Sequence, residues 1–170
     1  GVDASAAQRR EALDAFAEQF RAHLADDAPC EPVIEAMRDT MRRWSIPSEH
    51  VDAFLHSMRM DTHVSEYQTY DDLYEYVYGS AAVIGLQMVP ILGGSDESAF
   101  AAATDLGIAF QLANFIRDVG EDLDRGRVYL PMSELQAHGV TRDVLMRRQT
   151  TPAVKEALRE RSEEHTSELQ

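Results

Sequence analysis

One stretch decides the fold of this chain: Gln111-Leu-Ala-Asn114-Phe-Ile-Arg117-Asp118-Val-Gly120-Glu-Asp122-Leu-Asp-Arg-Gly-Arg127-Val-Tyr129-Leu-Pro131. Apolar residues over 100–115 recur with a helical period, and residues four apart on a helix lie on one face. Asn114, Asp118 and Asp122 have this spacing. With Gln111 they form a polar column about 12 Å long, at about 1.5 Å per residue. The opposite face carries the apolar residues Leu112, Phe115, Ile116 and Val119.

The column offers carboxylate and amide oxygens, which suit a hard cation such as Mg²⁺, with Mn²⁺ as an alternative. Mg²⁺ held in this way usually has phosphate oxygens in its shell. Arg117 and Arg127 beside the column could bind the remaining phosphate oxygens as bidentate partners.

A solvated helix face is the commoner cause of acidic residues at this spacing, but two features favour a ligand. Asp118 and Asp122 repel each other at four-residue spacing, which costs about 0.2–0.5 kcal/mol. Gly120 within a helix costs about 1 kcal/mol relative to alanine. Both features make more sense if a cation neutralises the column, so the sequence predicts a Mg²⁺-phosphate site here.

This stretch resembles the second aspartate-rich motif of the squalene and phytoene synthase family, the head-to-head prenyl diphosphate synthases. Two further segments are similar to family helices: Tyr76-Val-Tyr-Gly-Ser-Ala81-Ala-Val-Ile-Gly85 to its tyrosine–alanine–glycine helix, and Met58-Arg-Met-Asp61 to the helix before it. Residues 33–159 read in family order. The resemblance implies an all-α, isoprenoid synthase-type helical bundle.

The resemblance also implies roles for single residues. Asn114, Asp118 and Asp122 would hold Mg²⁺, while Gln111 would lie near a cyclopropyl diphosphate intermediate. Arg117 and Tyr129 would contact diphosphate or shield an allylic cation, so we count Asp118, Asp122, Arg117 and Tyr129 as catalytic candidates. The remaining substrate-binding candidates are Arg127 and Asp61 near the diphosphate and Tyr76, Ala81 and Gly85 along an apolar tunnel.

Segment 80–92 is apolar nearly all round and has two explanations. At 13 residues it is shorter than the roughly 20 needed to span a bilayer. A buried central helix, whose small residues pack against a neighbour, explains the pattern. A smooth tunnel for an isoprenoid tail explains it equally well, and the tunnel rests on the resemblance.

Composition limits the classes of function. The chain has 170 residues, 44% of them hydrophobic, and a net charge of −14. A protein this acidic, without a basic stripe to bind phosphates, is not expected to bind nucleic acid. The single Cys30 rules out an internal disulfide framework and fits a reducing compartment. We expect a cytoplasmic monomer without a transmembrane helix. This monomer is expected to contact the membrane face in order to reach its apolar substrates.

Sequence signals predict helices over 7–24, 33–44, 47–62, 70–91, from 95 through the column, and 132–138, with two more starting at Thr141 and Thr151. Thr69 and Asp72 have the form of a capping box for the 70–91 helix. Breakers over 26–32 predict a loop, whose Asp26-Asp27 pair is a poor metal candidate. Pro90 is expected to kink the end of its helix.

The boundaries of the domain are also predicted. Residues 161–170 read like a translated sequencing adapter, so we predict an appended tail after a partial synthase domain at 1–160. Nothing before Asp26 resembles the family's first aspartate-rich motif, which predicts a bundle incomplete on its N-terminal side. The 170-residue chain is therefore expected to form no hydrocarbon from prenyl diphosphates.

The resemblance is nearest to phytoene synthases, which condense two molecules of the twenty-carbon geranylgeranyl diphosphate to phytoene for carotenoid biosynthesis. Three alternatives stay open. One is a squalene or hydroxysqualene-type synthase using the fifteen-carbon farnesyl diphosphate. Another is a non-catalytic helical module that binds prenyl lipids or partners. The last is an acidic helical domain with no ligand.

Overall fold

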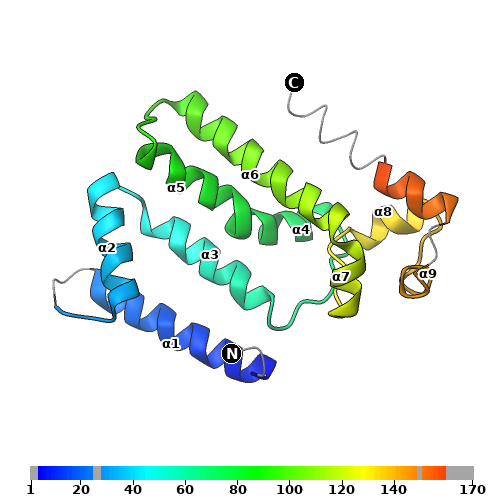
Figure 1. The fold of residues 1–170 in the computed structure, drawn as a ribbon, viewed down its shortest axis with the longest axis horizontal. Helices are drawn as coiled ribbons and strands as arrows, with labels where there is room; N and C mark the ends of the chain where they lie inside the picture. Colours follow the sequence, from blue (N-terminus) through cyan, green and yellow to red (C-terminus); the bar gives the residue numbers. More distant parts are fainter. Residues whose placement is uncertain (1–3, 25–27, 149–150, 160–170) are drawn as a thin grey trace.

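The computed structural model describes residues 4–24, 28–148 and 151–159. These residues form helices and no named strand (Figure 1): α1 Ala6–Leu24, α2 Pro32–Trp44, α3 Ser48–Met60, α4 Tyr70–Val77, the π-helix η1 Tyr78–Ala82, α5 Val83–Ile91, α6 Glu97–Arg117, α7 Val119–Asp124, α8 Met132–Ala137, α9 Arg142–Met146 and a last helix over 152–159. The all-α prediction is confirmed for these residues. Asp26-Asp27 and the 161–170 tail lie outside the described residues.

Local capping explains where several helices begin. Thr69 accepts a hydrogen bond from the Asp72 amide at 3.2 Å, and Asp72 accepts one from the Thr69 amide at 2.9 Å. This pair is the predicted capping box of α4. The side chains of Asp96 and Thr141 cap α6 and α9 by accepting a hydrogen bond from the amide three residues later, without the reciprocal bond. These signals are short-range, so the sequence reveals them directly.

The helices form a layered bundle around α3 and the α4–η1–α5 segment. In Figure 1, α6 covers α5 on one side of this centre, and α1 lies along α3 on the other. A central core joins α3, α4, η1 and α6 through Met60, Leu73, Ala81 and Leu112. A second core joins α7 to α8 and α9, and a third joins α1, α2 and α3.

The predicted helix over 70–91 is divided, and this is a correction to the sequence analysis. Residues 78–82 form the π-helix η1 between α4 and α5. A Cβ on Gly79 would lie 2.1 Å from the Ala53 carbonyl oxygen, so only glycine allows this contact with α3. The buried Ser57 hydroxyl donates to the Tyr76 carbonyl at 2.9 Å. π-Helical turns of this kind are frequent at functional sites.

The helix that carries the polar column is also divided. α6 ends at Arg117, and Asp118 has φ −99° and ψ 10° before α7 begins. The Asp118 amide still bonds the Asn114 carbonyl at 2.8 Å, and the Asp122 amide bonds Asp118 at 2.9 Å. The chain therefore keeps a helical course but changes direction, as Figure 1 shows. Gly120, predicted within one long helix, lies in the first turn of α7.

α6 departs from the expectation about membrane-spanning helices. By length and composition it is able to cross a membrane, and little of it is buried. The expectation of no such helix rested on segment 80–92, whose helix α5 is too short. The core helix of a soluble protein meets the same criterion of length and composition.

Candidate active site

Two segments far apart in the sequence meet at the end of the bundle. The Val128 amide donates to the Ser65 carbonyl at 2.8 Å, and the Met132 amide donates to the Tyr67 carbonyl at 2.9 Å. Glu66 and Val128 form an isolated parallel bridge. This pairing sets the chain after α7 beside the chain after α3, and so it brings Arg127 and Tyr129 to Asp61.

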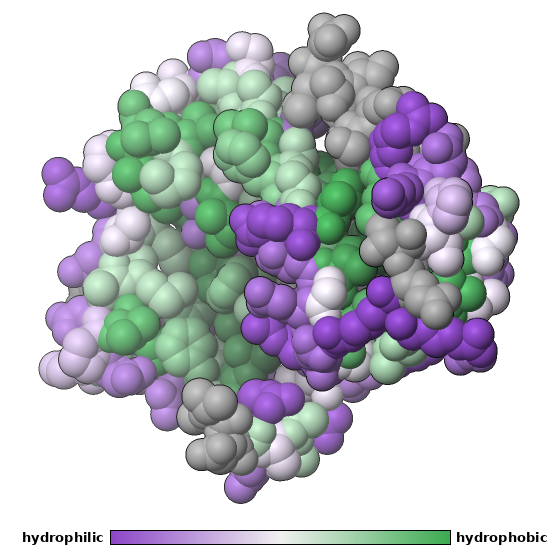
Figure 2. Space-filling view, turned by 45° about the vertical axis from the view of Figure 1, so that its right-hand side comes forward, coloured by the Kyte–Doolittle hydropathy of each residue, from purple (hydrophilic) through white to green (hydrophobic). Residues whose placement is uncertain are grey.

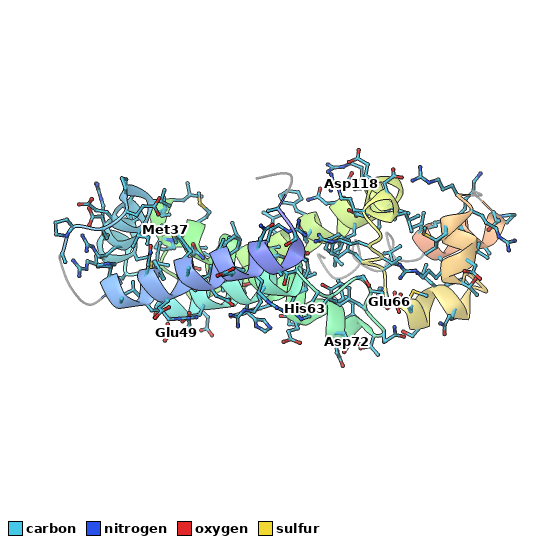
Figure 3. All side chains as sticks on the ribbon, turned by 90° about the horizontal axis from the view of Figure 1, so that it is seen from below. Met37, Glu49, His63, Glu66, Asp72 and Asp118 are labelled. Atoms are coloured by element: carbon cyan, nitrogen blue, oxygen red, sulfur yellow. The ribbon has the colours of Figure 1, made fainter. Side chains whose placement is uncertain are left out.

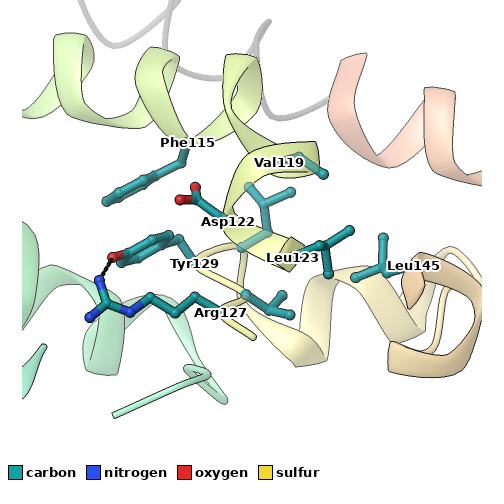
Figure 4. Close-up of a pocket in the computed structure, with 9 residues that line it drawn as sticks. Phe115, Val119, Asp122, Leu123, Arg127, Tyr129 and Leu145 are labelled. Carbon is teal, nitrogen blue, oxygen red and sulfur yellow. Dashed lines mark hydrogen bonds between the residues drawn. The ribbon is translucent and has the colours of Figure 1, made fainter. Parts of the chain in front are cut away.

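Asp61 is the centre of a cluster with Tyr76, Arg127 and Tyr129, which we call the Asp61 cluster. Its carboxylate accepts hydrogen bonds from the Tyr76 hydroxyl at 3.1 Å and the Tyr129 hydroxyl at 3.2 Å. Arg127 Nη1 lies 3.0 Å from Asp61 Oδ1, and Arg127 Nη2 donates to the Asp61 carbonyl at 2.6 Å. Arg127 also donates to the Tyr129 hydroxyl at 2.9 Å (Figure 4). The site candidates Asp61, Tyr76, Arg127 and Tyr129 thus form one network.

Aromatic rings surround the Asp61 cluster. Phe115 stacks on Tyr129 with ring centroids 4.2 Å apart and planes 6° from parallel. Tyr67 lies 5.8 Å from Tyr76 and 6.1 Å from Tyr129, centroid to centroid. Sequence reasoning did not assign Tyr67 or Phe115 to the site. Phe115 could have been found from its place in the opening stretch, whereas nothing near Tyr67 marks it.

Burial controls the protonation of the tyrosines. It raises the pKa of Tyr67, Tyr76 and Tyr129, and the charge of Asp61 raises all three further. Their hydroxyls therefore stay protonated, and those of Tyr76 and Tyr129 donate to the Asp61 carboxylate. Burial alone would lower the pKa of Arg127, but Asp61 beside it raises that pKa above its usual value.

Asp118 lies at the junction of α6 and α7 and is paired with its neighbour. Nε and Nη2 of Arg117 donate to the two carboxylate oxygens of Asp118, both at 2.7 Å. These hydrogen bonds from Arg117 are the main cause that lowers the pKa of Asp118, so the carboxylate is ionised at neutral pH. Figure 3 shows Asp118 and Asp72 projecting on opposite sides of the molecule. A contact of Arg117 with phosphate stays a prediction, since its guanidinium lies on Asp118 here.

Asp122 is a buried carboxylate with a distant cation. Only 8% of the residue is exposed, and its ion pair with Arg125 is long, at 3.9 Å. Burial raises the pKa of Asp122, with the nearby Asp118 charge adding to the shift. In Figure 4 its carboxylate lies beside Phe115 and above Tyr129. The adjoining cavity of about 10 Å³ is about the size that one water needs.

The polar column is not one continuous helix face, which corrects the sequence analysis. Gln111 and Asn114 belong to α6, Asp122 belongs to α7, and Asp118 lies between them. In the described part of the chain, no three His, Cys, Asp or Glu side chains gather as a metal site. Two carboxylates and an amide still fit the mode in which Mg²⁺ takes one or two carboxylates and completes its shell with phosphate and water.

An apolar cavity of about 420 Å³ lies between α5 and α6. Ala81, Gly85 and Gln111 line it, whereas Tyr76 does not and is buried in the central core. Its other walls carry large exposed hydrophobic side chains, namely Ile84, Met88, Leu92, Leu106 and Phe110. Figure 2 shows apolar side chains gathered on the left of its face and polar ones on the right.

The small residues of segment 80–92 serve helix packing as well. A Cβ on Gly85 would lie 2.3 Å from the Ala103 carbonyl oxygen, and one on Gly107 would lie 2.7 Å from that of Ala81. α5, η1 and α6 therefore approach closely because these positions lack side chains. The packing explanation holds for Gly85, and the same residue borders the cavity.

Comparison with known proteins places this chain in a family. Residues 1–169 match the family described as squalene/phytoene synthase. The chain belongs to this family. Its members are prenyltransferases, and the fold prediction is confirmed. Among curated relatives, the chloroplastic phytoene synthase of Daucus carota is 38% identical over 146 residues, which cover 82% of this chain and 36% of the relative.

Solved structures of the family have the same fold. The squalene synthase HpnC from Alicyclobacillus acidocaldarius superposes with a TM-score of 0.83 at 28% identity, covering 93% of this chain and 61% of that one. A dehydrosqualene synthase solved with a ligand gives 0.82 at 26% identity, covering 91% and 55%. The chain therefore spans about a third of its first curated relative and somewhat more than half of these structures.

Proposed function

We propose that this chain forms part of a Mg²⁺-dependent synthase that joins two prenyl diphosphates head to head. One observation carries the proposal: α6 lines an apolar cavity, and two carboxylates follow at its C-terminal end, Asp118 as its cap and Asp122 on α7. Gln111 lies in the cavity wall, Asn114 follows about one turn later, and Asp118 ends the helix. An amphiphile with an apolar tail and a diphosphate head matches this order of surfaces.

The proposed head group site uses Asn114, Asp118 and Asp122 as ligands of Mg²⁺. When bound there, Mg²⁺ acts as a Lewis acid on the diphosphate leaving group. The buried Asp122 supports this role, because a second positive charge near it would offset the penalty of burying its negative charge. Arg117 is exposed beside Asp118 and could turn from that carboxylate to phosphate oxygens.

The Asp61 cluster is proposed to form the wall of the reacting region. The Tyr129 hydroxyl is held by Asp61 and Arg127, so its ring is the part that remains for substrate. Tyr129 is partly exposed beside the buried Phe115 on which it stacks, and an aromatic ring attracts a nearby cation. Shielding of an allylic cation by these rings fits the geometry better than a diphosphate contact by Tyr129.

The apolar walls are proposed to protect the reaction from water. α5 has no charged residue, and the cavity walls are mostly hydrophobic. The cavity is open to solvent in this chain, so its apolar walls would keep water from a carbocation on the sides that they cover. Such walls would suit condensation through a cyclopropyl diphosphate, the intermediate implied by the family resemblance.

We propose geranylgeranyl diphosphate as substrate and phytoene as product. Support comes from the phytoene synthase relatives, such as that of Arabidopsis thaliana at 43% identity over 119 residues. The fifteen-carbon alternative is supported by the fold of the squalene and dehydrosqualene synthases at lower identity. The length of apolar chain that the cavity accepts separates the two.

The test is ligand-induced stabilisation of the chain. We expect Mg²⁺ and pyrophosphate together to raise the Tm, and either alone to have little effect. Asp118→Asn should abolish this shift, while the matched control Asp105→Asn, on the exposed surface of α6, should preserve it. No shift in the unmutated chain would overturn the proposal and favour a helical domain without a ligand.

A second measurement tests the prenyl chain. Non-ionisable analogues of the twenty- and fifteen-carbon diphosphates should bind with Mg²⁺, the longer one more tightly. Tighter binding of the fifteen-carbon analogue would replace phytoene with a squalene-type product. If a prenyl alcohol binds with an affinity that depends on neither Mg²⁺ nor Asp118, the result would favour the non-catalytic lipid-binding module.

A further inference from the structure

A second set of contacts lies behind the Asp61 cluster, on the side of α9. Arg142, the first residue of α9, donates through Nη1 to the Glu66 carboxylate and through Nη2 to the Gly126 carbonyl at 3.3 Å. These two partners belong to the two segments that bring the Asp61 cluster together. Arg142 therefore joins both segments from outside.

Both partners of Arg142 lie next to segments that carry Arg127 and Tyr129 of the Asp61 cluster. Gly126 directly precedes Arg127 and has φ +75°, a conformation that glycine favours. Glu66 forms the backbone bridge to Val128, which directly precedes Tyr129. A shift of either partner would move Arg127 or Tyr129 relative to Asp61.

We propose that Arg142 is a positioning residue, which holds the 124–127 turn against Glu66 so that Arg127 and Tyr129 reach Asp61. Its effect on a diphosphate ligand rests on the proposed function. Its effect on the Asp61 cluster does not, because those contacts exist in the chain without ligand.

The chemistry of arginine is needed for this role. Glu66 and Arg142 are partly exposed, and an ion pair of this kind contributes little on its own. The planar guanidinium bonds a carboxylate and a carbonyl in different directions at once, whereas lysine provides a compact point charge. Arg142→Lys should therefore keep the pair with Glu66 and lose the hold on Gly126.

The first test uses the ligand-free chain. The Arg127 Nε–H signal in a ¹⁵N NMR spectrum, assigned by its loss in Arg127→Lys, reports on the Asp61 cluster. We expect Arg142→Gln to shift or broaden this signal and Arg142→Lys to give an intermediate change. Arg147→Gln, which removes the same charge from an exposed position at the end of α9, should leave the signal unchanged. An unchanged Arg127 signal in folded Arg142→Gln or Arg142→Lys would overturn the proposal.

The second test uses Mg²⁺-pyrophosphate as the probe. Arg142→Gln should weaken its binding by about 10-fold, because the turn that Arg142 holds is bonded to the proposed ligand Asp122: the Arg127 amide donates to the Asp122 carbonyl at 2.8 Å. Arg147→Gln should bind as the unmutated chain does. If the unmutated chain binds no Mg²⁺-pyrophosphate, the proposed function fails, while the NMR result still decides the role of Arg142. If Arg142→Gln does not fold, the Arg142→Lys variant carries both tests.

Discussion

The Asp61 cluster and the pair Asp118–Asp122 place acidic groups in opposite situations. Asp61 is surrounded by Arg127, two tyrosine hydroxyls and stacked rings, all within the protein. Asp122 is more deeply buried, yet its ion-pair partner Arg125 lies 3.9 Å away. The charge and hydrogen-bonding capacity of Asp61 are met by partners within the protein, so the Asp61 cluster should stabilise the fold. In the second region Asp118 is paired with the exposed Arg117, whereas the buried Asp122 has only the long ion pair, so this region should gain from a bound cation.

The largest expected effect follows removal of the Asp61 carboxylate. Asp61→Ala would leave Arg127 and the hydroxyls of Tyr76 and Tyr129 without their shared acceptor, and we expect a loss of about 2–3 kcal/mol in unfolding free energy. Urea denaturation monitored by circular dichroism measures it. Asp105→Ala, at an exposed position of α6, serves as the control and should change stability by less than about 0.5 kcal/mol.

Removal of one stacked ring should have a smaller effect. Phe115→Leu keeps an apolar side chain in the central core but removes the 4.2 Å stack on Tyr129. We expect a loss of about 1–1.5 kcal/mol in unfolding free energy. The same denaturation experiment measures it, and a loss as large as that of Asp61→Ala would mean that packing, not the carboxylate, holds this region.

Asp122→Asn should stabilise the chain in the absence of Mg²⁺ at pH 7. Burial raises the pKa of Asp122, so the ionised form of this side chain opposes folding. The unfolding free energy is therefore greater at low pH, where Asp122 is protonated, and falls as the pH rises through that pKa. The gain from asparagine should therefore shrink as the pH falls below the pKa of Asp122. Melting temperatures between pH 4 and pH 8 test this, and a variant less stable than the parent at pH 7 would contradict it.

The smallest expected change in stability is that of Asp118→Asn. Asp118 is partly exposed and paired with an exposed Arg117, so its loss should leave the urea midpoint unchanged. Binding of Mg²⁺-pyrophosphate, measured by calorimetry, should nevertheless fall by at least about 10-fold. A marked loss of stability with unchanged binding would remove the contrast between the two regions.

Local rules explain which parts could be predicted. The capping box of Thr69 and Asp72 lies within four residues, and the structure contains it. Leu112 and Phe115, predicted opposite the polar column, are buried, because their spacing alone puts them on one face. The break at Asp118 was missed, since backbone hydrogen bonds on both sides continue with helical spacing and no proline marks the change.

By itself, the sequence determined where most of the helices lie, the family and the candidate residues, because caps, periodicity and motifs act over a few neighbouring positions. The tertiary structure alone decided how those candidates meet. Asp61 and Arg127 are 66 residues apart and meet only because segments 65–68 and 128–133 pair. The π-helix likewise accompanies the close approach of Gly79 to Ala53 on another helix. Such contacts depend on packing between distant elements, which no local pattern records.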